Sequence, residues 1–225
     1  MKKLLIVAFV WSTTCAIAQQ SENRSVGSFR GIKAAEGIDV FLKKGDKELL
    51  KVEVSGTKLS NVITEVSGDY LKIHMAEGRY NDRAVKVFVT YVELNKLSAS
   101  SAANIFSEGT IKAKQLAISA SSAGTIEAQI DADEVEANAS SAAELELKGR
   151  ARVLQIDVSS AAEVDAYELI ADEVEAEASS GASAKVNVVK EITAHASSGG
   201  GIRFKGNPER SDTNSSSGGF VKKSY

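Results

Sequence analysis

A pair of adjacent serines recurs at a nearly fixed interval through the second half of this 225-residue chain. Successive pairs are separated by 21, 19, 19, 20, 18 and 19 residues, and small residues (Ala or Gly) follow them. The pairs are Ser100-Ser101, Ser121-Ser122, Ser140-Ser141, Ser159-Ser160, Ser179-Ser180, Ser197-Ser198 and Ser216-Ser217. Residues 132–143 and 171–182, which each contain one pair, are identical at ten of twelve positions. A period of this length indicates a solenoid of stacked structural repeats.

Within each repeat, apolar and polar residues alternate strictly, which is the period of a β-strand and not of a helix. The apolar series of one repeat is Val135, Ala137, Ala139, Ala143, Leu145 and Leu147. One repeat alone cannot bury such a face, whereas coils stacked about 4.8 Å apart pair every backbone group with the coils above and below. We therefore predict an all-β fold, with a parallel β-solenoid of seven coils of about 19 residues in the C-terminal half.

The small residues of each repeat are expected to form a bend of the coil. We assign the second serine of each pair to the interior, where the hydroxyl can bond to turn backbone and the small side chains let two sheets close. This prediction places one buried column of hydroxyls at successive bends: Ser101, Ser122, Ser141, Ser160, Ser180 and Ser198. The last repeat, residues 213–221, has Thr213 and Ser215 at inward positions. We expect it to be a polar cap, because a terminal coil faces water.

Residues 24–96 also alternate in short strand-like segments, separated by turn signals such as Lys44-Gly45-Asp46 and Ser67-Gly68-Asp69. These segments do not share the register of the serine repeats. Because the larger side chains are concentrated here and coils with alanine cores bury little area, we expect this part to nucleate and cap the solenoid.

The first 18 residues have the pattern of a secretory signal peptide: Lys2 and Lys3, a short apolar run, and a small-x-small site at Ala16-Ile17-Ala18. The predicted division is a signal peptide over 1–18 and a single domain over 19–225, in which 24–96 precede the repeats of 97–221. Cys15 lacks the flanking residues of a lipoprotein site, so we favour cleavage after Ala18. The mature chain then has no cysteine and no apolar stretch of the roughly 20 residues that a transmembrane helix needs.

Charge is distributed unevenly along the chain. Without Lys2 and Lys3, 25 basic residues face 30 acidic ones, which gives a net charge of −5 and disfavours nucleic acid as a partner. Residues 24–96 carry 13 basic and 10 acidic side chains, whereas residues 131–191 carry 5 and 15. We interpret the acidic excess as a solvated face.

Several segments resemble the head GIN domain family of putative autotransporter adhesins. The resemblance rests on SFRGIKAAEGIDVFLKKGD at 28–46, KVEVSG at 51–56, GDYLKIHM at 68–75 and the serine- and glycine-centred repeat, and it extends from about Val26 to Val221. It implies a right-handed parallel β-helix with no assigned catalytic residues and a proposed role in adhesion. Most bends here read Ser-Ser-Ala, where the family more often has a Gly-Ser-Gly type, which would make the bends stiffer.

Candidate catalytic and metal-binding residues are few. A nucleophilic serine needs a base within hydrogen-bond reach, and the only histidines are His74 and His195. We interpret His195, near Ser197 on one face, as a solvated strand residue, and His74 has no second ligand at metal-binding spacing. The acidic clusters Asp131-Asp133-Glu134 and Asp172-Glu173 lack the glycine-rich pattern of calcium-binding β-rolls. We therefore predict no catalytic, cofactor-binding or metal-binding residues.

These observations favour an exported, non-catalytic β-solenoid in the periplasm, on the outer-membrane surface or outside the cell. Its expected partner is an unidentified glycan or protein ligand, and the sequence leaves the oligomeric state open. Two alternatives remain: a polysaccharide-active enzyme of the pectin-lyase type and a purely structural envelope spacer. A hexapeptide-repeat acyltransferase is disfavoured by the strict alternation. Aromatic residues are scarce after Val92, so a ligand surface is expected within residues 24–96.

Overall fold

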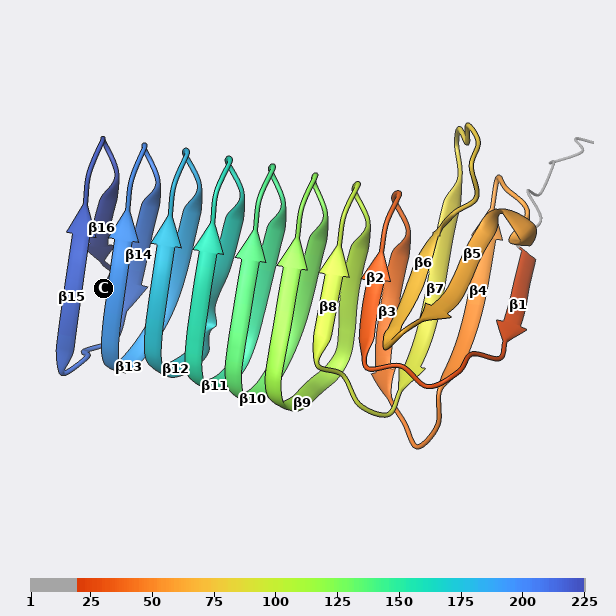
Figure 1. The fold of residues 1–225 in the computed structure, drawn as a ribbon, viewed down its shortest axis with the longest axis horizontal. Helices are drawn as coiled ribbons and strands as arrows, with labels where there is room; N and C mark the ends of the chain where they lie inside the picture. The colour runs from red at the N-terminus through yellow and green to blue at the C-terminus, as the bar shows by residue number, and fades with distance from the viewer. Residues whose placement is uncertain (1–19, 225) are drawn as a thin grey trace, which may run out of the picture.

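The structure is a computed structural model that describes residues 20–224; the predicted signal peptide and Cys15 lie outside the described residues. The chain winds into a right-handed solenoid in which each coil rises along one face, reverses at a tight turn and descends along the other (Figure 1). The strands of the repeat are β8 (Lys96–Ala99), β9 (Asn104–Ala120), β10 (Thr125–Ala139), β11 (Glu144–Val158), β12 (Glu163–Ala178), β13 (Ser183–Ala196), β14 (Gly201–Lys205), β15 (Arg210–Ser215) and β16 (Phe220–Lys223). Neighbouring coils pair in parallel, which confirms the predicted fold class.

The solenoid has four surfaces. The turn edge carries the serine pairs, and the bend edge lies opposite, where β9 to β13 curve without interruption (Figure 1). The pre-turn face contains the strand segments that lead into each turn, with β6 (Tyr70–Met75), β2 (Gly31–Ala34) and β8. The post-turn face contains the segments that follow, with β7 (Ala84–Tyr91), β3 (Asp39–Lys44) and β14.

The predicted alternation of buried and exposed residues is confirmed. In the coil around Ser179, Ala176, Ala178 and Ala182 are 1 to 2% exposed, while Glu175 and Glu177 face solvent. Small inward side chains let the two faces approach closely, so that a thin apolar core runs the length of the rod. None of the described residues forms a helix long and apolar enough to cross a membrane.

The predicted column of buried serines is wrong. The second serine of each pair is exposed, and the first is half-buried in all but the last coil. Ser141 and Ala142 have φ of 55° and 58°, and Ala143 N–H donates to the Ser140 carbonyl at 3.2 Å. Such a two-residue turn has both central residues in the left-handed region and directs their side chains outward. Counting every second residue inward assumed an extended chain, which the turn interrupts.

The sequence suggested that residues 24–96 lie outside the register of the serine repeats, and this prediction is wrong for residues 31–44. Strands β2 and β3 flank a turn at Glu36 and Gly37, whose φ values are 63° and 65°. The Gly37 N–H donates to the Ser101 carbonyl at 2.9 Å, and Ala102 N–H makes the equivalent bond to Ser122. The β2–β3 unit is therefore a coil of the same stack, and its turn lacks the serine signature.

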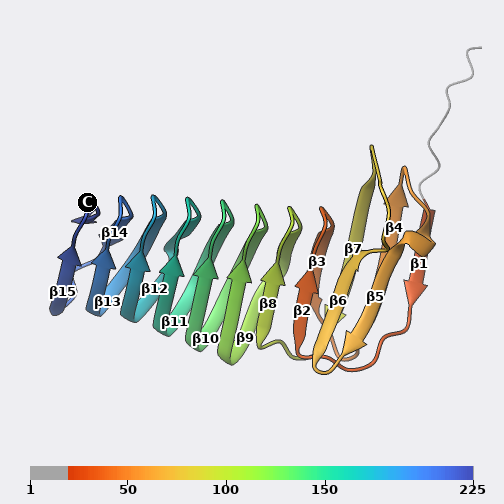
Figure 2. The ribbon, with the colours of Figure 1, turned by 45° about the horizontal axis from the view of Figure 1, so that its top comes forward.

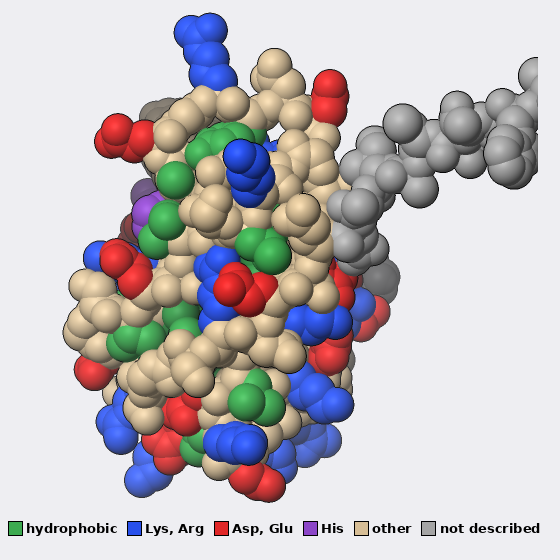
Figure 3. Space-filling model, turned by 90° about the vertical axis from the view of Figure 1, so that its right-hand side faces the viewer, with side chains coloured by type: hydrophobic (Ala, Val, Ile, Leu, Met, Phe, Trp, Pro, Cys, Tyr) green, Lys and Arg blue, Asp and Glu red, His purple; other side chains and the backbone are tan. Residues whose placement is uncertain are grey.

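Beyond this coil, β6 and β7 form a further parallel layer, pairing with β2 and β3 respectively. Antiparallel strands then close the N-terminal end: β4 (Leu49–Ser55) on β7, β5 (Val62–Ser67) on β6 and β1 (Gln20–Arg24) on β4, with the short 3-10 helix Leu59–Asn61 beside them (Figure 2). Viewed onto this capped end, side chains of both charges surround small hydrophobic areas (Figure 3). At the opposite end, all six residues of β15 are exposed, which confirms the polar cap.

The order of the coils in space differs from their order in the chain. After β3, the chain builds β4 and β5, forms the β6–β7 layer, and returns past the β2–β3 coil through residues 92–95 to begin β8. Strand β9 pairs with β3 as far as Ser107 and with β8 only from Ala117 onward. Among the described strands, none pairs with residues 108–116 along the edge of β9 that faces β3 and β8. We call this interruption, formed by residues 92–95 and 108–116, the seam.

Candidate functional site

The turn edge presents stacked small, uncharged residues. Its coils repeat Ser-Ser followed by Ala or Gly, and each turn is linked to the next by one backbone hydrogen bond of 2.9 to 3.1 Å. This ladder explains the sequence signature through backbone geometry. Neither His74 nor His195 lies in these turns: His195 is exposed on β13, and His74 Nδ1 lies 2.9 Å from the Met75 carbonyl oxygen on β6.

The pre-turn face of the repeats is acidic. Adjacent strands present carboxylates on this face: Glu134 and Glu136 on β10, Asp157 on β11, and Glu175 and Glu177 on β12, of which Asp157 and Glu177 are direct neighbours. Two of these acids are hydrogen-bonded by amides of the preceding coil, Glu134 by Gln115 at 2.9 Å and Glu175 by Gln155 at 3.4 Å. The remaining charge repels anionic polymers from this face.

Two of the acidic residues that the sequence offered as calcium ligands are paired with lysines. Asp131 lies 3.7 Å from Lys112, and Asp172 lies 2.8 Å from Lys190. Across residues 20–224, no three or more His, Cys, Asp or Glu side chains are grouped so as to hold a metal ion. That no metal is bound stays a prediction.

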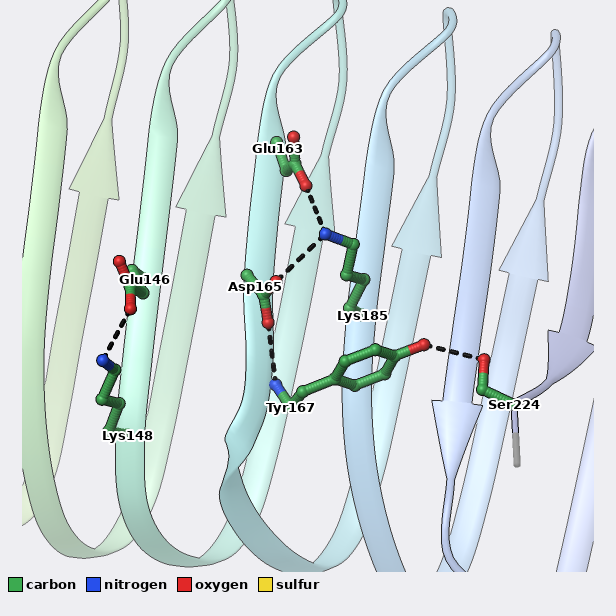
Figure 4. A network of polar contacts seen from close by, with 7 residues as sticks. All are labelled: Glu146, Lys148, Glu163, Asp165, Tyr167, Lys185 and Ser224. Carbon is green, nitrogen blue, oxygen red and sulfur yellow. Dashed lines mark hydrogen bonds and ion pairs between the residues drawn. The ribbon is translucent and has the colours of Figure 1, made fainter.

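The post-turn face carries a compensated polar network (Figure 4). Lys185 donates to Glu163 at 2.8 Å and to Asp165 at 3.0 Å, and these hydrogen bonds raise the pKa of Lys185. Asp165 also accepts from the Tyr167 N–H at 3.1 Å, and the Tyr167 hydroxyl lies 2.8 Å from Ser224 Oγ. Lys185 is shared by two carboxylates, and Lys148 lies 2.7 Å from Glu146. The network therefore stabilises the stacking of the last coils but keeps an excess of negative charge, which disfavours an anionic ligand.

Three phenylalanines also stack on the post-turn face. Phe41 lies 5.2 Å from Phe88 and 5.3 Å from Phe106, measured between ring centroids. The rings cover one another's faces, so they present edges rather than a flat platform. Sequence reasoning missed this ladder because the three residues come from strands far apart in the chain, although all of them occupy outward positions.

At the bend edge, the seam contains a hollow of about 470 Å³. One wall is the crossing segment 92–95 and the other is the bend of β9 at 112–115. Four basic residues line it: Arg30, Lys44, Lys112 and Lys114. We call it the basic hollow.

The charge of the basic hollow is only partly balanced. Arg30 lies 3.8 Å from Glu93, and Lys112 lies 3.7 Å from Asp131. The two side chains of each ion pair are more than half exposed. Within the part of the chain that the structure describes, no ion pair or hydrogen bond engages the ammonium groups of Lys44 and Lys114. The hollow therefore concentrates positive charge beside an unpaired strand edge.

A second hollow, of about 310 Å³, lies where the seam reaches the pre-turn face. We call it the mixed hollow, because Tyr70, Lys96, Glu134 and Glu136 line it together with Ala117. Asn95 and Gln115 belong to the linings of both hollows, which therefore adjoin along the seam; we call the two hollows together the groove.

The Tyr70 ring is held over the backbone of β2. A Cβ atom at Gly31 would lie 2.5 Å from this ring, so the ring requires glycine there. The ammonium groups of Lys33 and Lys96 lie 4.4 Å and 5.7 Å from the ring centroid, which is a favourable cation–π arrangement. The sequence placed a ligand surface within residues 24–96 but missed the contribution of β9, because chain crossing alone brings Lys112 and Lys114 to this site.

Comparisons with known proteins agree with this architecture. Residues 28–208 match the family model described as "Putative auto-transporter adhesin, head GIN domain". No curated protein matches the chain.

Several solved structures share the fold. A putative adhesin from Bacteroides fragilis NCTC 9343 is 17% identical and has a TM-score of 0.85, with 93% of this chain and 98% of that chain covered. A putative adhesin from Parabacteroides merdae ATCC 43184 is 16% identical, with a TM-score of 0.78 and coverage of 92% and 96%. A putative lipid binding protein from Parabacteroides distasonis ATCC 8503 is 18% identical, with a TM-score of 0.71 and coverage of 92% and 97%.

Proposed function

Because the chain belongs to the head GIN domain family of putative auto-transporter adhesins, we propose that it is an exported, non-catalytic, adhesin-like module that binds its ligand in the groove along the seam. The observation that carries this proposal is the basic hollow, where Lys44 and Lys114 lie beside a strand edge without a strand partner. The predicted signal peptide supports export.

The charges of the groove favour an anionic ligand. A carboxylate or other anion placed between Arg30, Lys44 and Lys114 would form charge-assisted hydrogen bonds, which at exposed side chains contribute about 0–1 kcal/mol each. The unpaired side of residues 108–116 adds backbone donors and acceptors at the same place. The repeats offer less to an anion, because their pre-turn face is acidic and the network of Figure 4 has three carboxylates for two lysines.

The alternative to a binding function is that the groove belongs to a polysaccharide-cleaving enzyme. Cleavage would need a base poised for proton abstraction together with a group that stabilises the resulting charge. Glu134 and Glu136 are the carboxylates of the mixed hollow; Glu134 is half-buried and Glu136 exposed, and each accepts a hydrogen bond from a side-chain amide. We assign them to binding rather than to proton transfer.

The proposal is tested with a glycan and host-protein array probed with residues 19–225. The key variant combines Arg30→Gln, Lys44→Gln, Lys112→Gln and Lys114→Gln, and it should lose at least tenfold in binding to each array ligand. A matched control removes four exposed basic residues elsewhere: Lys58→Gln, Arg79→Gln, Arg150→Gln and Arg152→Gln.

The control variant should bind like the unmodified protein. Equal binding by the two variants would show that the seam is not the site. If the unmodified protein binds nothing on the array, the proposed binding function is wrong, and the result favours a purely structural envelope spacer.

A further inference from the structure

The two hollows of the groove differ in the chemistry that they accept. The basic hollow is lined by four cations and by Glu93 as its single acid. The mixed hollow has Lys96 on one wall and the carboxylates of Glu134 and Glu136 on the other. A ligand that fills both therefore carries negative charge at one end and is neutral at the other, since a uniform polyanion would meet like charge in the mixed hollow.

The lining of the groove also favours a hydroxyl-rich ligand. Leu94 and Leu116 border the hollows but are 3% and 1% exposed, so neither offers an apolar surface. Peptides are usually anchored by aromatic or aliphatic side chains in apolar pockets. The partly exposed apolar residues here, Val92 and Ala113 in the basic hollow and Tyr70 and Ala117 in the mixed hollow, instead lie among charged and amide side chains. Gln115 already donates to Glu134 at 2.9 Å, and Asn138 donates to Glu136 at 2.8 Å. The Asn95 amide and the remaining donors and acceptors of Gln115, Glu134 and Glu136 provide the hydrogen bonds that sugar hydroxyls need.

Ala117 makes room for such a ligand. It lies in the row of outward positions that continues through Glu136 on β10 and Gln155 on β11. Where those coils carry a long side chain, β9 carries a methyl group, and the floor of the mixed hollow is open at this point. The sheet geometry tolerates glutamine in this row, as Gln155 shows.

Resting on the proposed function, we infer that the ligand is an oligosaccharide that ends in one acidic sugar and continues into neutral sugars. The acidic sugar lies in the basic hollow among Arg30, Lys44, Lys112 and Lys114. The neutral sugars pass Asn95 and Gln115 and lie over Ala117, beside Tyr70.

Isothermal titration calorimetry with three trisaccharides tests this inference on residues 19–225. The probes are 3′-sialyllactose, which has one terminal acidic sugar; globotriose, which is neutral; and trigalacturonate, which is acidic throughout. We expect 3′-sialyllactose to bind at least tenfold more tightly than either of the others. Raising the salt concentration should weaken its binding, because the cations of the basic hollow are exposed.

Two single variants separate the two ends of the ligand. Ala117→Gln keeps the charge but fills the floor of the mixed hollow, and it should weaken 3′-sialyllactose at least tenfold. Lys114→Gln should weaken 3′-sialyllactose by a similar factor and leave globotriose unchanged. The matched control is Thr193→Gln, which places the same side chain in the same row at a distant coil, and it should bind like the unmodified protein.

The remaining outcomes overturn the inference in distinguishable ways. Trigalacturonate binding as tightly as 3′-sialyllactose would identify a polyanion site, and tight binding of the peptide acetyl-Glu-Ser-Ser-amide would identify a peptide site. If no trisaccharide binds while array binding persists and depends on the four cations, the ligand class is wrong and the proposed function stands. If array binding is also lacking, both fail.

Discussion

Residues in the left-handed backbone region explain why serine, alanine and glycine recur at the turns. The second and third turn positions both have positive φ, about 50° to 60° where Ser is followed by Ala. Ala occupies the third position in four coils, at residues 102, 123, 142 and 161, and Gly occupies it at 181, 199 and 218. An L-residue in this region costs about 1–2 kcal/mol, which glycine avoids.

Replacing one of these alanines by glycine therefore tests the turn geometry. Ala142→Gly removes the cost of the left-handed backbone in the folded state. It also raises the conformational entropy of the unfolded chain, which lowers the free energy of unfolding by about 0.4–1 kcal/mol. We expect a net stabilisation of about 0.5 kcal/mol, measured by urea unfolding. A destabilisation of more than about 1 kcal/mol would mean that residue 142 does not occupy the left-handed region.

The alternation of faces gives a second residue-scale prediction. Ala178→Glu places a carboxylate in the closed interior, where a charge without a partner costs several kcal/mol even after relaxation. Glu177→Ala, one residue away on the acidic face, should change stability by no more than about 0.5 kcal/mol. Thermal melts of the two variants decide the point, and the assignment of faces fails if Glu177→Ala is the more damaging.

Along the bend edge, the sign of the charged side chains alternates from one coil to the next. Lys112 and Lys114 on β9 are followed by Asp131 and Asp133 on β10, and then by Arg150 and Arg152 on β11. The strand register places Lys112, Asp131 and Arg150 side by side. Each exposed pair contributes only about 0–1 kcal/mol, but a shift by one coil would bring like charges together. This pattern therefore supports the correct stacking order.

Glycine at a bend has a different role from glycine at a turn. Gly149 has φ of 113°, and a Cβ atom there would lie 2.0 Å from the Ile130 carbonyl oxygen of the adjacent coil. Gly149→Ala should therefore cost about 3 kcal/mol or more. At Gly181, no atom lies within 4 Å of a Cβ, and alanine stands at the equivalent position of four coils.

The matched variant Gly181→Ala should cost no more than about 1 kcal/mol in the same urea titrations. Equal losses in Gly149→Ala and Gly181→Ala would contradict the close approach of coils at the bend.

At the scale of elements, the sequence predicts the repeats well and the N-terminal part poorly. Regular alternation around each serine pair fixes strand type and burial, because period-2 patterning reflects which side chains face the core. The turn at Glu36-Gly37 lacks that signature, and about 50 inserted residues separate β3 from β8. Strand pairing across such an insertion is decided by tertiary packing, so neither the β2–β3 coil nor the seam was predictable.

The whole molecule combines a basic N-terminal part with acidic repeats, and the seam lies at their boundary. This arrangement confines an acid-bearing ligand to the groove, since the neighbouring pre-turn face repels it. The candidate site draws Lys112 and Lys114 from the first repeat and Arg30 and Lys44 from the N-terminal part. The sequence shows both groups of basic residues, but only the path of residues 92–95 in the fold shows that they line the same hollow.

A binding module should release no products from polysaccharides. We expect no unsaturated oligosaccharides from pectin, alginate or glycosaminoglycans incubated with residues 19–225, with or without calcium. Absorbance near 235 nm follows such products, and a protein-dependent rise would overturn the assignment as a non-enzyme.

Export is testable at the N-terminus of the mature protein. Mass spectrometry of protein from its native host should show a chain that begins at Gln19, because the predicted signal peptide ends at Ala18. A diacylated Cys15 would instead identify a lipoprotein.

The central claim is that ligand binding belongs to the seam and not to the serine repeats. Hydrogen–deuterium exchange of residues 19–225, with and without the strongest ligand from the array, tests it most directly. The account predicts slower exchange in residues 92–95 and 108–116, where one side of β9 lacks a strand partner, and unchanged exchange at the turns from Ser121 to Ser217. Protection along those turns, or none in the seam, would contradict it.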